Sequence, residues 1–150
     1  FVNAPVASGA TRLPGEGKAF TRIKTVADLE QAVAGARAAG RPVLLDFYAD
    51  WCVSCKEMEK YTFPDPVVQA ALADALVLQA DVTAVDAEDQ ELMRRFGIIG
   101  PPTIMFFTAD GIEQTSRRIV GFKPAADFAA HVSAVFGGSP TTTAVATNLN

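Results

Sequence analysis

The feature that most constrains the fold of this chain is a Cys-Val-Ser-Cys motif, whose Cys52 and Cys55 are the only cysteines among 150 residues. It follows a nearly continuous apolar run, residues 41–49, typical of a buried parallel strand, and it opens residues 52–61, whose composition suits a helix. One helical turn apart, the two Cα atoms can approach within the roughly 5–6 Å that an unstrained disulfide needs. The motif therefore predicts a disulfide that opens and closes without moving the fold.

Cys52 is the better candidate for the attacking thiol because it would occupy the helix N-terminus. Unpaired backbone N–H groups and the positive end of the helix dipole favour a thiolate there, lowering a pKa that is about 8.5 in a free cysteine. The thiolate is the nucleophile in disulfide exchange. We therefore assign Cys52 as the attacking cysteine and Cys55, further inside the helix and better shielded, as the resolving one.

Composition and charge narrow the class of protein. With 49% hydrophobic residues in 150, the chain can bury one sizeable core, and we expect one monomeric globular domain. The net charge is −4, and lysines and arginines are spread along the chain, so neither nucleic acid nor an anionic membrane is an expected partner. No apolar run approaches the ~20 residues that span a bilayer, so we expect no direct membrane insertion.

The order of the predicted elements indicates an α/β fold. Residues 1–18 mix proline, glycine and small residues and are predicted to be a linker, residues 19–136 the domain, and residues 137–150 a flexible tail. Capping patterns and hydrophobic periodicity predict strands at 20–23, 41–49, 76–82, 103–108 and 112–120, and helices at 25–40, 52–61, 65–73, 86–96 and 124–136. These elements imply a mixed central sheet flanked by helices on both faces.

This order resembles the thioredoxin fold, because Trp-Cys-Xaa-Xaa-Cys follows the second strand and Pro-Thr follows the third helix. Residues 47–63 and 100–104, within a similarity spanning 20–136, resemble the C-terminal periplasmic domain of the DsbD family of transmembrane thiol:disulfide interchange proteins. The resemblance implies a periplasmic shuttle without metal or organic cofactor. Its implied partners are a membrane-embedded electron-donor domain and an N-terminal periplasmic domain of the same protein family.

The resemblance also implies a docking edge beside the disulfide. It makes the peptide bond before Pro102 cis, with Pro101 preceding it and Thr103 opening the next strand. A proline there lacks the N–H that would compete with a partner segment for neighbouring backbone groups. The alternative is that the two prolines only interrupt the chain before a strand. Trp51 is predicted to pack over the disulfide and shape the docking surface, or else to be ordinary core.

Two carboxylates are candidates for controlling the thiols. Asp46 interrupts the apolar strand 43–48, where burial demands a raised pKa or a specific partner. The resemblance places Asp46 beneath the disulfide, where it can exchange a proton with Cys55, although it can also be a hydrogen-bonded core residue without a catalytic part. Glu59 lies on the same helical stripe as Cys55; it either raises the thiol pKa values with Asp46 or is a solvated partner of a lysine.

The proposed activity is protein-disulfide reduction by disulfide exchange, and three alternatives stay open. Val53 and Ser54 supply no cation to the thiolate, and Asp46 and Glu59 oppose it, so we expect a potential nearer about −270 mV than about −120 mV. The alternatives are a free-standing thioredoxin-like reductase, for example in cytochrome c maturation, a soft-metal site on the two thiolates, and a structural disulfide. The metal site lacks further Cys or His ligands nearby, and so short a loop stabilises a fold little.

Overall fold

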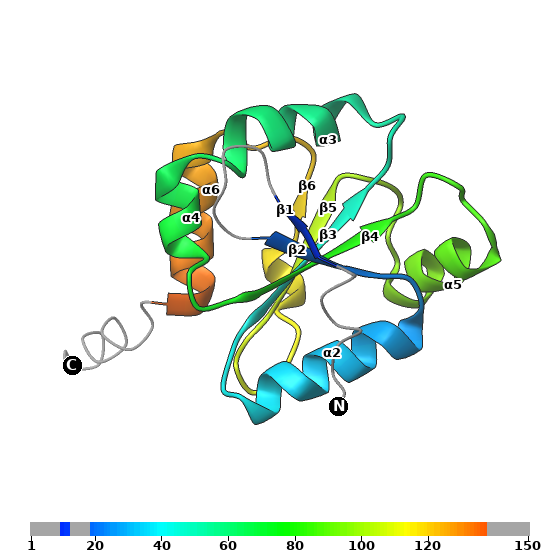
Figure 1. The fold of residues 1–150 in the computed structure, drawn as a ribbon, viewed down its shortest axis with the longest axis horizontal. Helices are drawn as coiled ribbons and strands as arrows, with labels where there is room; N and C mark the ends of the chain where they lie inside the picture. Colours follow the sequence, from blue (N-terminus) through cyan, green and yellow to red (C-terminus); the bar gives the residue numbers. More distant parts are fainter. Residues whose placement is uncertain (1–9, 13–18, 138–150) are drawn as a thin grey trace.

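A mixed β-sheet with helices on both faces organises the computed structural model, which describes residues 10–12 and 19–137 (Figure 1). Within these residues the strand order is β1-β2-β4-β3-β5-β6. Strands β2 and β3 run parallel to β4, whereas β1 pairs with β2, β5 with β3 and β6 with β5 in antiparallel fashion. The strands are β1 Ala10–Arg12, β2 Ala19–Ile23, β3 Val43–Tyr48, β4 Leu76–Asp81, β5 Thr103–Phe107 and β6 Ile119–Val120.

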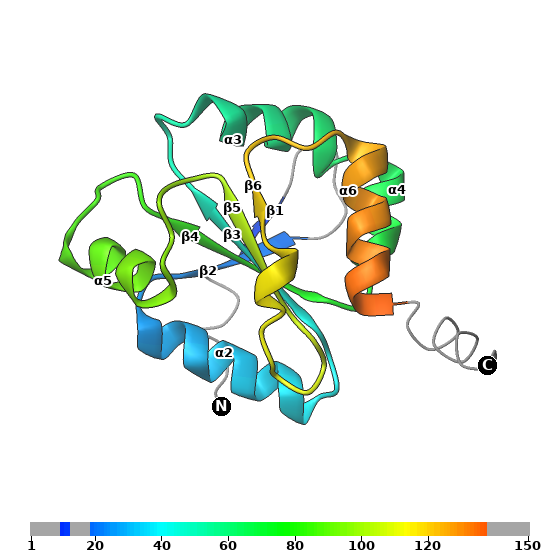
Figure 2. The same ribbon diagram turned by 180° about the vertical axis from the view of Figure 1, so that it is seen from behind.

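The helices form two layers, one on each side of the sheet (Figure 2). Helices α2 Val26–Ala38 and α5 Ala87–Phe96 cover one face, and α3 Val53–Glu57, α4 Pro66–Ala71 and α6 Ala125–Val132 cover the other. Each layer has its own buried apolar cluster: Leu29 and Leu92 belong to the first, and Phe63 and Phe128 to the second. Because β3 is buried on both faces, it separates the two clusters and carries Asp46 at its centre.

Most helix ends lie where side-chain capping predicts them. In α2, the Thr25 hydroxyl accepts the backbone N–H of Asp28 at 3.0 Å, and the Asp28 carboxylate accepts the N–H of Thr25 at 3.0 Å. Asp86 caps α5 in the same reciprocal way, and Gly97 ends it with a φ of 68°. Asp65 caps α4 ahead of Pro66. Each cap stabilises its helix by about 1 kcal/mol, so these polar residues fix the boundaries of the elements around the disulfide.

Residues 112–120 do not form the continuous return strand that we expected. Only β6 and an isolated bridge between Phe107 and Glu113 pair with β5, and a 3₁₀ turn, η2 Thr115–Arg117, lies between them. The Arg118 guanidinium donates to the Glu113 carboxylate at 2.6 and 3.0 Å and to the Phe96 carbonyl at 2.7 Å. These side-chain bonds hold the middle of the segment outside the ladder, so the antiparallel return is confirmed at its two ends and its continuity was wrong.

Three other boundaries differ from the sequence-based prediction. Within the predicted linker, residues 10–12 form β1, since an edge strand such as β2 offers backbone partners to any extended segment. The helix after the disulfide continues as a π-helical turn, η1 Met58–Thr62, and the last helix ends in another, η3 Ser133–Gly137. The rest of the predicted linker and the predicted tail from residue 138 lie outside the described residues. Within residues 10–12 and 19–137, no helix has the length and hydropathy needed to cross a bilayer.

Candidate redox site

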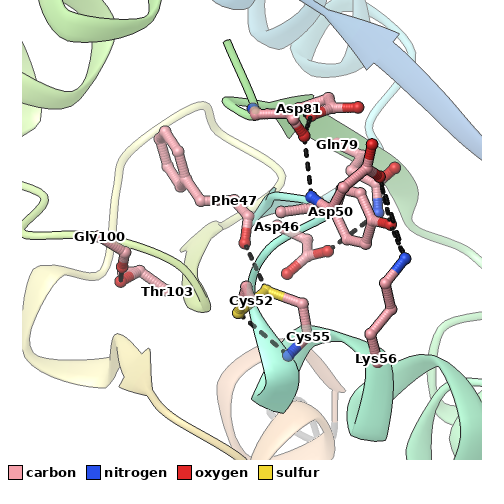
Figure 3. Close-up of a disulfide and its surroundings, with 12 residues drawn as sticks. Asp46, Phe47, Asp50, Cys52, Cys55, Lys56, Gln79, Asp81, Gly100 and Thr103 are labelled. Carbon is pink, nitrogen blue, oxygen red and sulfur yellow. Dashed lines mark hydrogen bonds and ion pairs between the residues drawn. A yellow bond between two sulfur atoms is a disulfide. The ribbon is translucent and has the colours of Figure 1, made fainter. Parts of the chain in front are cut away.

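Cys52 and Cys55 form a disulfide at the start of α3, with their Cα atoms 5.2 Å apart. Cys52 is the N-cap of this helix: its Sγ accepts the backbone N–H of Cys55 at 3.1 Å, as Figure 3 shows. Side-chain burial is nearly complete for both residues, with 7% of Cys52 and 3% of Cys55 exposed. The backbone N–H of Cys55, which donates to Cys52 Sγ, would stabilise a thiolate at that sulfur. This supports Cys52 as the nucleophile.

Cys55 lies on the inner side of the motif, against β3. Its Sγ is 3.9 Å from the carbonyl oxygen of Phe47, the residue that follows Asp46 in the strand. In the reduced protein the Cys55 thiol can donate to this carbonyl, an arrangement that favours the protonated form. A base is therefore needed to deprotonate Cys55 when it resolves a mixed disulfide.

Asp46 is the buried carboxyl group nearest in the chain to this thiol. Only 3% of its surface is exposed, and Figure 3 shows its side chain pointing to the side of β3 that carries the disulfide. The Gln79 amide donates to Asp46 Oδ2 at 3.1 Å. Burial raises the pKa of Asp46 to about 7, against the opposing effect of the Gln79 hydrogen bond, and the Glu59 carboxylate raises it further. Asp46 can thus both accept and release a proton near neutral pH.

Glu59 lies in η1, half-buried above the same end of the sheet. Burial raises its pKa, while the positive charges of Lys56 and Arg22 lower it. Its charge acts on Asp46, so the two carboxyl groups that the sequence singled out belong to one electrostatic site.

Two charged side chains beside the motif, Lys56 and Asp50, both contact the hydroxyl of Tyr48. The Lys56 ammonium lies 2.5 Å from the Tyr48 hydroxyl and 5.0 Å from the centre of its ring, and the hydroxyl donates to Asp50 at 2.9 Å. Lys56 also lies 3.9 Å from the Asp50 carboxylate. Because this lysine is already engaged by Tyr48 and Asp50, it is held away from the role of a thiolate counter-ion.

The rim of the site combines an exposed tryptophan with the proline loop. Trp51 is 56% exposed, and its indole N–H donates to the carbonyl of Thr83 at 3.0 Å. The bond between Pro101 and Pro102 is cis, as the resemblance implied, and the Thr103 hydroxyl donates to the Gly100 carbonyl at 2.7 Å. Thr103 pairs with Phe47 across β5 and β3, so the loop ends beside the strand that contacts Cys55.

Comparison with known proteins decides the family. A family model described as thioredoxin-like matches residues 24–109, more than half of the chain. The crystal structure of the oxidised DsbD C-terminal domain of Neisseria meningitidis superposes with a TM-score of 0.63 and 37% identity, covering 73% of this chain and 95% of that one. This chain belongs to the thioredoxin-like C-terminal domains of DsbD.

Other relatives agree with this membership. The thiol:disulfide interchange protein DsbD of Ralstonia nicotianae is 51% identical over 131 residues, which are 87% of this chain and 21% of that protein. The protein of the same name from Salmonella paratyphi A is 57% identical over 113 residues, 75% of this chain and 20% of its own length. The chain thus spans about a fifth of the length of these curated relatives. The predicted thioredoxin fold is confirmed.

In this DsbD-family domain, the sequence-predicted site residues gather at one end of the sheet. Cys52 and Cys55 lie at the start of α3, Asp46 lies on the neighbouring strand β3, and Glu59 lies in the turn η1 that follows α3. The loop that holds Pro101, Pro102 and Thr103 enters β5 next to β3. Pro101 lacks a backbone N–H, and the Pro102 carbonyl accepts the N–H of Gly121 at 3.0 Å. The docking edge is therefore poorer in free backbone groups than we expected from the proline motif.

Sequence reasoning missed the partner of Asp46. Gln79 is 1% exposed and lies on β4 directly beside Asp46 in the parallel pairing. A polar residue inside the apolar strand 76–82 was the available indication, the same one that identified Asp46 in β3. Among the described residues, no group of three or more His, Cys, Asp or Glu side chains is placed to hold a metal ion.

Proposed function

We propose that this domain is a protein-disulfide reductase that exchanges the Cys52–Cys55 disulfide with protein partners. The observation that carries the proposal is the position of Cys52 as N-cap of α3. Its sulfur accepts the backbone N–H of Cys55, the residue whose sulfur completes the disulfide. Membership of the DsbD family supports the same reaction. The redox-active group is the disulfide itself.

The first step is attack on a partner disulfide by the reduced domain. The Cys52 thiolate forms a bond to one partner sulfur, and the other partner sulfur leaves as a thiolate that takes up a proton. The helix terminus stabilises the Cys52 thiolate before attack. The product is a mixed disulfide between Cys52 and the partner.

The second step releases the partner. Asp46 takes the proton of the Cys55 thiol, and the Cys55 sulfur attacks Cys52 Sγ, which re-forms the disulfide and frees the second partner thiolate. Two electrons pass from the domain to the partner. With a pKa of about 7, Asp46 is ionised in a substantial fraction of molecules at neutral pH and can serve as the acceptor.

The direction of transfer follows from what surrounds the thiolate. Asp46 and Glu59 place negative charge near it, and the Lys56 cation is engaged by Tyr48 and Asp50. A strongly oxidising couple owes its potential to a stabilised reduced form, so this domain should lie nearer about −270 mV than about −120 mV. Equilibration against a thiol:disulfide buffer measures this, and a potential at or above about −150 mV would overturn the assignment as a reductant.

The proposed partners are a membrane-embedded domain that donates electrons and an N-terminal domain that receives them, both of the DsbD family. The names of the curated relatives and the share of their length that the chain matches support a domain of a longer thiol:disulfide interchange protein. Our proposal places this domain in the periplasm. A free-standing reductase of the same fold, for example in cytochrome c maturation, would use the same steps and differ only in its partners.

Trapping tests the exchange and identifies the partner together. In a Cys55→Ala variant, Cys52 should remain linked to its partner because no resolving thiol is present, and mass spectrometry of periplasmic extract should recover the linked protein. Cys52→Ala is the matched control and should trap none. If both variants recovered the same proteins, or neither recovered any, the shuttle would be rejected. A metal titration of the reduced protein separates the soft-metal alternative, which requires tight stoichiometric binding.

A further inference from the structure

Three side chains form a row across the sheet that ends at the buried carboxyl group. Arg22 on β2 is the Cα partner of Gln79 on β4, and Gln79 is the Cα partner of Asp46 on β3. Partners in parallel strands project to the same face, so the three side chains follow one another across neighbouring strands. The row runs from an exposed guanidinium to the site beneath the disulfide.

The hydrogen bonds along this row have a fixed polarity. Arg22 Nε donates to Gln79 Oε1 at 2.7 Å, and Gln79 Nε2 donates to Asp46 Oδ2 at 3.1 Å. An amide offers one accepting and one donating end, whereas a guanidinium can only donate. Because Arg22 binds the carbonyl end, the NH₂ end of Gln79 has to face Asp46.

The orientation of this amide decides which form of Asp46 is better solvated. With its NH₂ end toward Asp46, Gln79 stabilises the carboxylate. Rotated by 180°, the amide would offer its carbonyl oxygen. This oxygen accepts a hydrogen bond from the protonated carboxyl group of Asp46 and repels the carboxylate. Burial by itself leaves the choice of amide orientation open, and Arg22 is the described group that settles it.

We propose that Arg22 is a positioning residue of the redox site: it fixes the Gln79 amide with its donor end toward Asp46 and so keeps Asp46 available as the proton acceptor for Cys55. The inference rests on the proposed role of Asp46 in the exchange reaction. It assigns a part in the pH dependence of resolution to an exposed side chain on β2, which reaches Asp46 through two successive hydrogen bonds.

Other charged groups around Asp46 come from the helical side. Glu59 in η1 raises the pKa of Asp46, whereas Arg22 also lowers it directly through its charge. Lys56 and Asp50 act on Glu59 and not directly on Asp46. On β5, the neighbour of Asp46 is the apolar Ile104. An Arg22 variant also frees Asp81, which pairs with Arg22 at 3.3 Å, so an experiment has to separate both of these charge effects from amide orientation.

A double-mutant cycle on the oxidised chain makes this separation. The carboxyl carbon of Asp46 is followed by NMR against pH in the unaltered chain, in Arg22→Met, in Gln79→Met and in the double variant. We expect Arg22→Met to lower the acid dissociation constant of Asp46 about three- to tenfold, the scale of one ordinary intramolecular hydrogen bond. In the Gln79→Met background the same change should have less than half this effect on a logarithmic scale.

A matched control and a salt series complete the design. Arg95→Met removes another exposed cation, one whose distance of 3.3 Å to Glu30 equals that from Arg22 to Asp81, and it should leave the Asp46 titration unchanged. In 1 M salt the effect of Arg22→Met should persist, because the hydrogen bond between Gln79 and Asp46 is buried and is screened little. If Gln79→Met fails to fold, Gln79→Leu takes its place in the cycle.

The outcomes divide cleanly. An effect of Arg22→Met that is equal in both Gln79 backgrounds, or that disappears in 1 M salt, would overturn the inference in favour of charge alone; no effect at all would overturn it outright. Because the oxidised chain has no free thiol and no partner, this titration is independent of whether exchange occurs. Conversely, a failed trapping experiment with Cys55→Ala would reject the shuttle without changing the titration of Asp46. In the reduced chain, the pH at half-maximal resolution should rise in Arg22→Met.

Discussion

Replacing Asp46 by asparagine should stabilise the oxidised domain, increasingly so as the pH rises from about 4 to about 7. Asparagine has nearly the same shape and can still accept the Gln79 amide hydrogen bond, but it never carries charge. Asp46 has to become a buried anion as the pH rises, which is costly. The variant should therefore match the parent at pH 4 and exceed it at pH 8.

The size of the effect follows from linkage. Burial raises the pKa of Asp46 to about 7 from an ordinary 3.8. Between these values the folded protein holds a proton that the unfolded chain has released, so stability falls as pH rises through this window and is lowest above about pH 7. A difference of about 3 pH units, at about 1.4 kcal/mol each, gives roughly 4 kcal/mol in favour of the variant at pH 8.

Urea unfolding of both proteins at pH 4, 6 and 8 is the assay. For a slope of about 2 kcal/mol per M, the midpoint of Asp46→Asn should exceed that of the parent by about 2 M at pH 8. Asp28→Asn is the contrasting control, because backbone hydrogen bonds from the α2 cap lower the pKa of Asp28. This second variant should be less stable than the parent at pH 6 and 8 by the same amount, and the deficit should shrink only at and below the ordinary carboxyl range, because the pKa of Asp28 is lowered and not raised.

One result would refute the reasoning about Asp46. If the difference in unfolding free energy between Asp46→Asn and the parent were equal at pH 4 and pH 8 within about 0.5 kcal/mol, the carboxyl group would not titrate with a raised pKa in the folded state. Its assignment as the proton acceptor for Cys55 would then lose its physical basis.

Three further substitutions test other parts of the site and the core. Glu59→Gln should raise the thiolate fraction of the reduced protein at pH 7 about threefold, followed by absorbance at 240 nm, because it removes a half-buried negative charge; the exposed Glu57 mutated to Gln should change it little. Trp51→Ala should raise the KM for a disulfide partner about tenfold with an unchanged urea midpoint, whereas Ile112→Ala, at 57% exposure against 56%, should leave the KM unaltered. Phe63→Ala should cost about 3–5 kcal/mol of unfolding free energy, since its buried ring meets two other phenylalanine rings edge to face, and a loss below about 1 kcal/mol would contradict that packing.

Local chemistry explains which parts of the structure could be predicted. The capping residues Thr25, Asp65 and Asp86 accept hydrogen bonds from N–H groups two or three residues away. These contacts can therefore be predicted from a short stretch of sequence. The same holds for Cys52, whose place at the start of α3 follows from its position after an apolar strand. Asp46 was identifiable because a charge inside a buried strand has few physical solutions.

Contacts between distant segments explain the rest. Gln79 is 33 positions from Asp46 and 57 from Arg22, and only the strand order and register bring the three together. Residues 112–120 alternate well enough for a strand, but Arg118 satisfies Glu113 and a carbonyl on another element instead. One sequence shows neither register nor a competing long-range side-chain bond, so these features required coordinates.

The cap that Cys52 provides makes the start of α3 a reporter of the state of the sulfur. The bond from the Cys55 N–H to Cys52 Sγ is 3.1 Å in the disulfide form, where the acceptor is neutral. Reduction to the thiolate turns the same contact into a charge-assisted bond, about twice as strong. The backbone amide of Cys55 should then exchange with deuterium several times more slowly in the reduced protein than in the oxidised one. Hydrogen exchange at this single amide would thus follow electron transfer through the domain without a chemical probe on either sulfur.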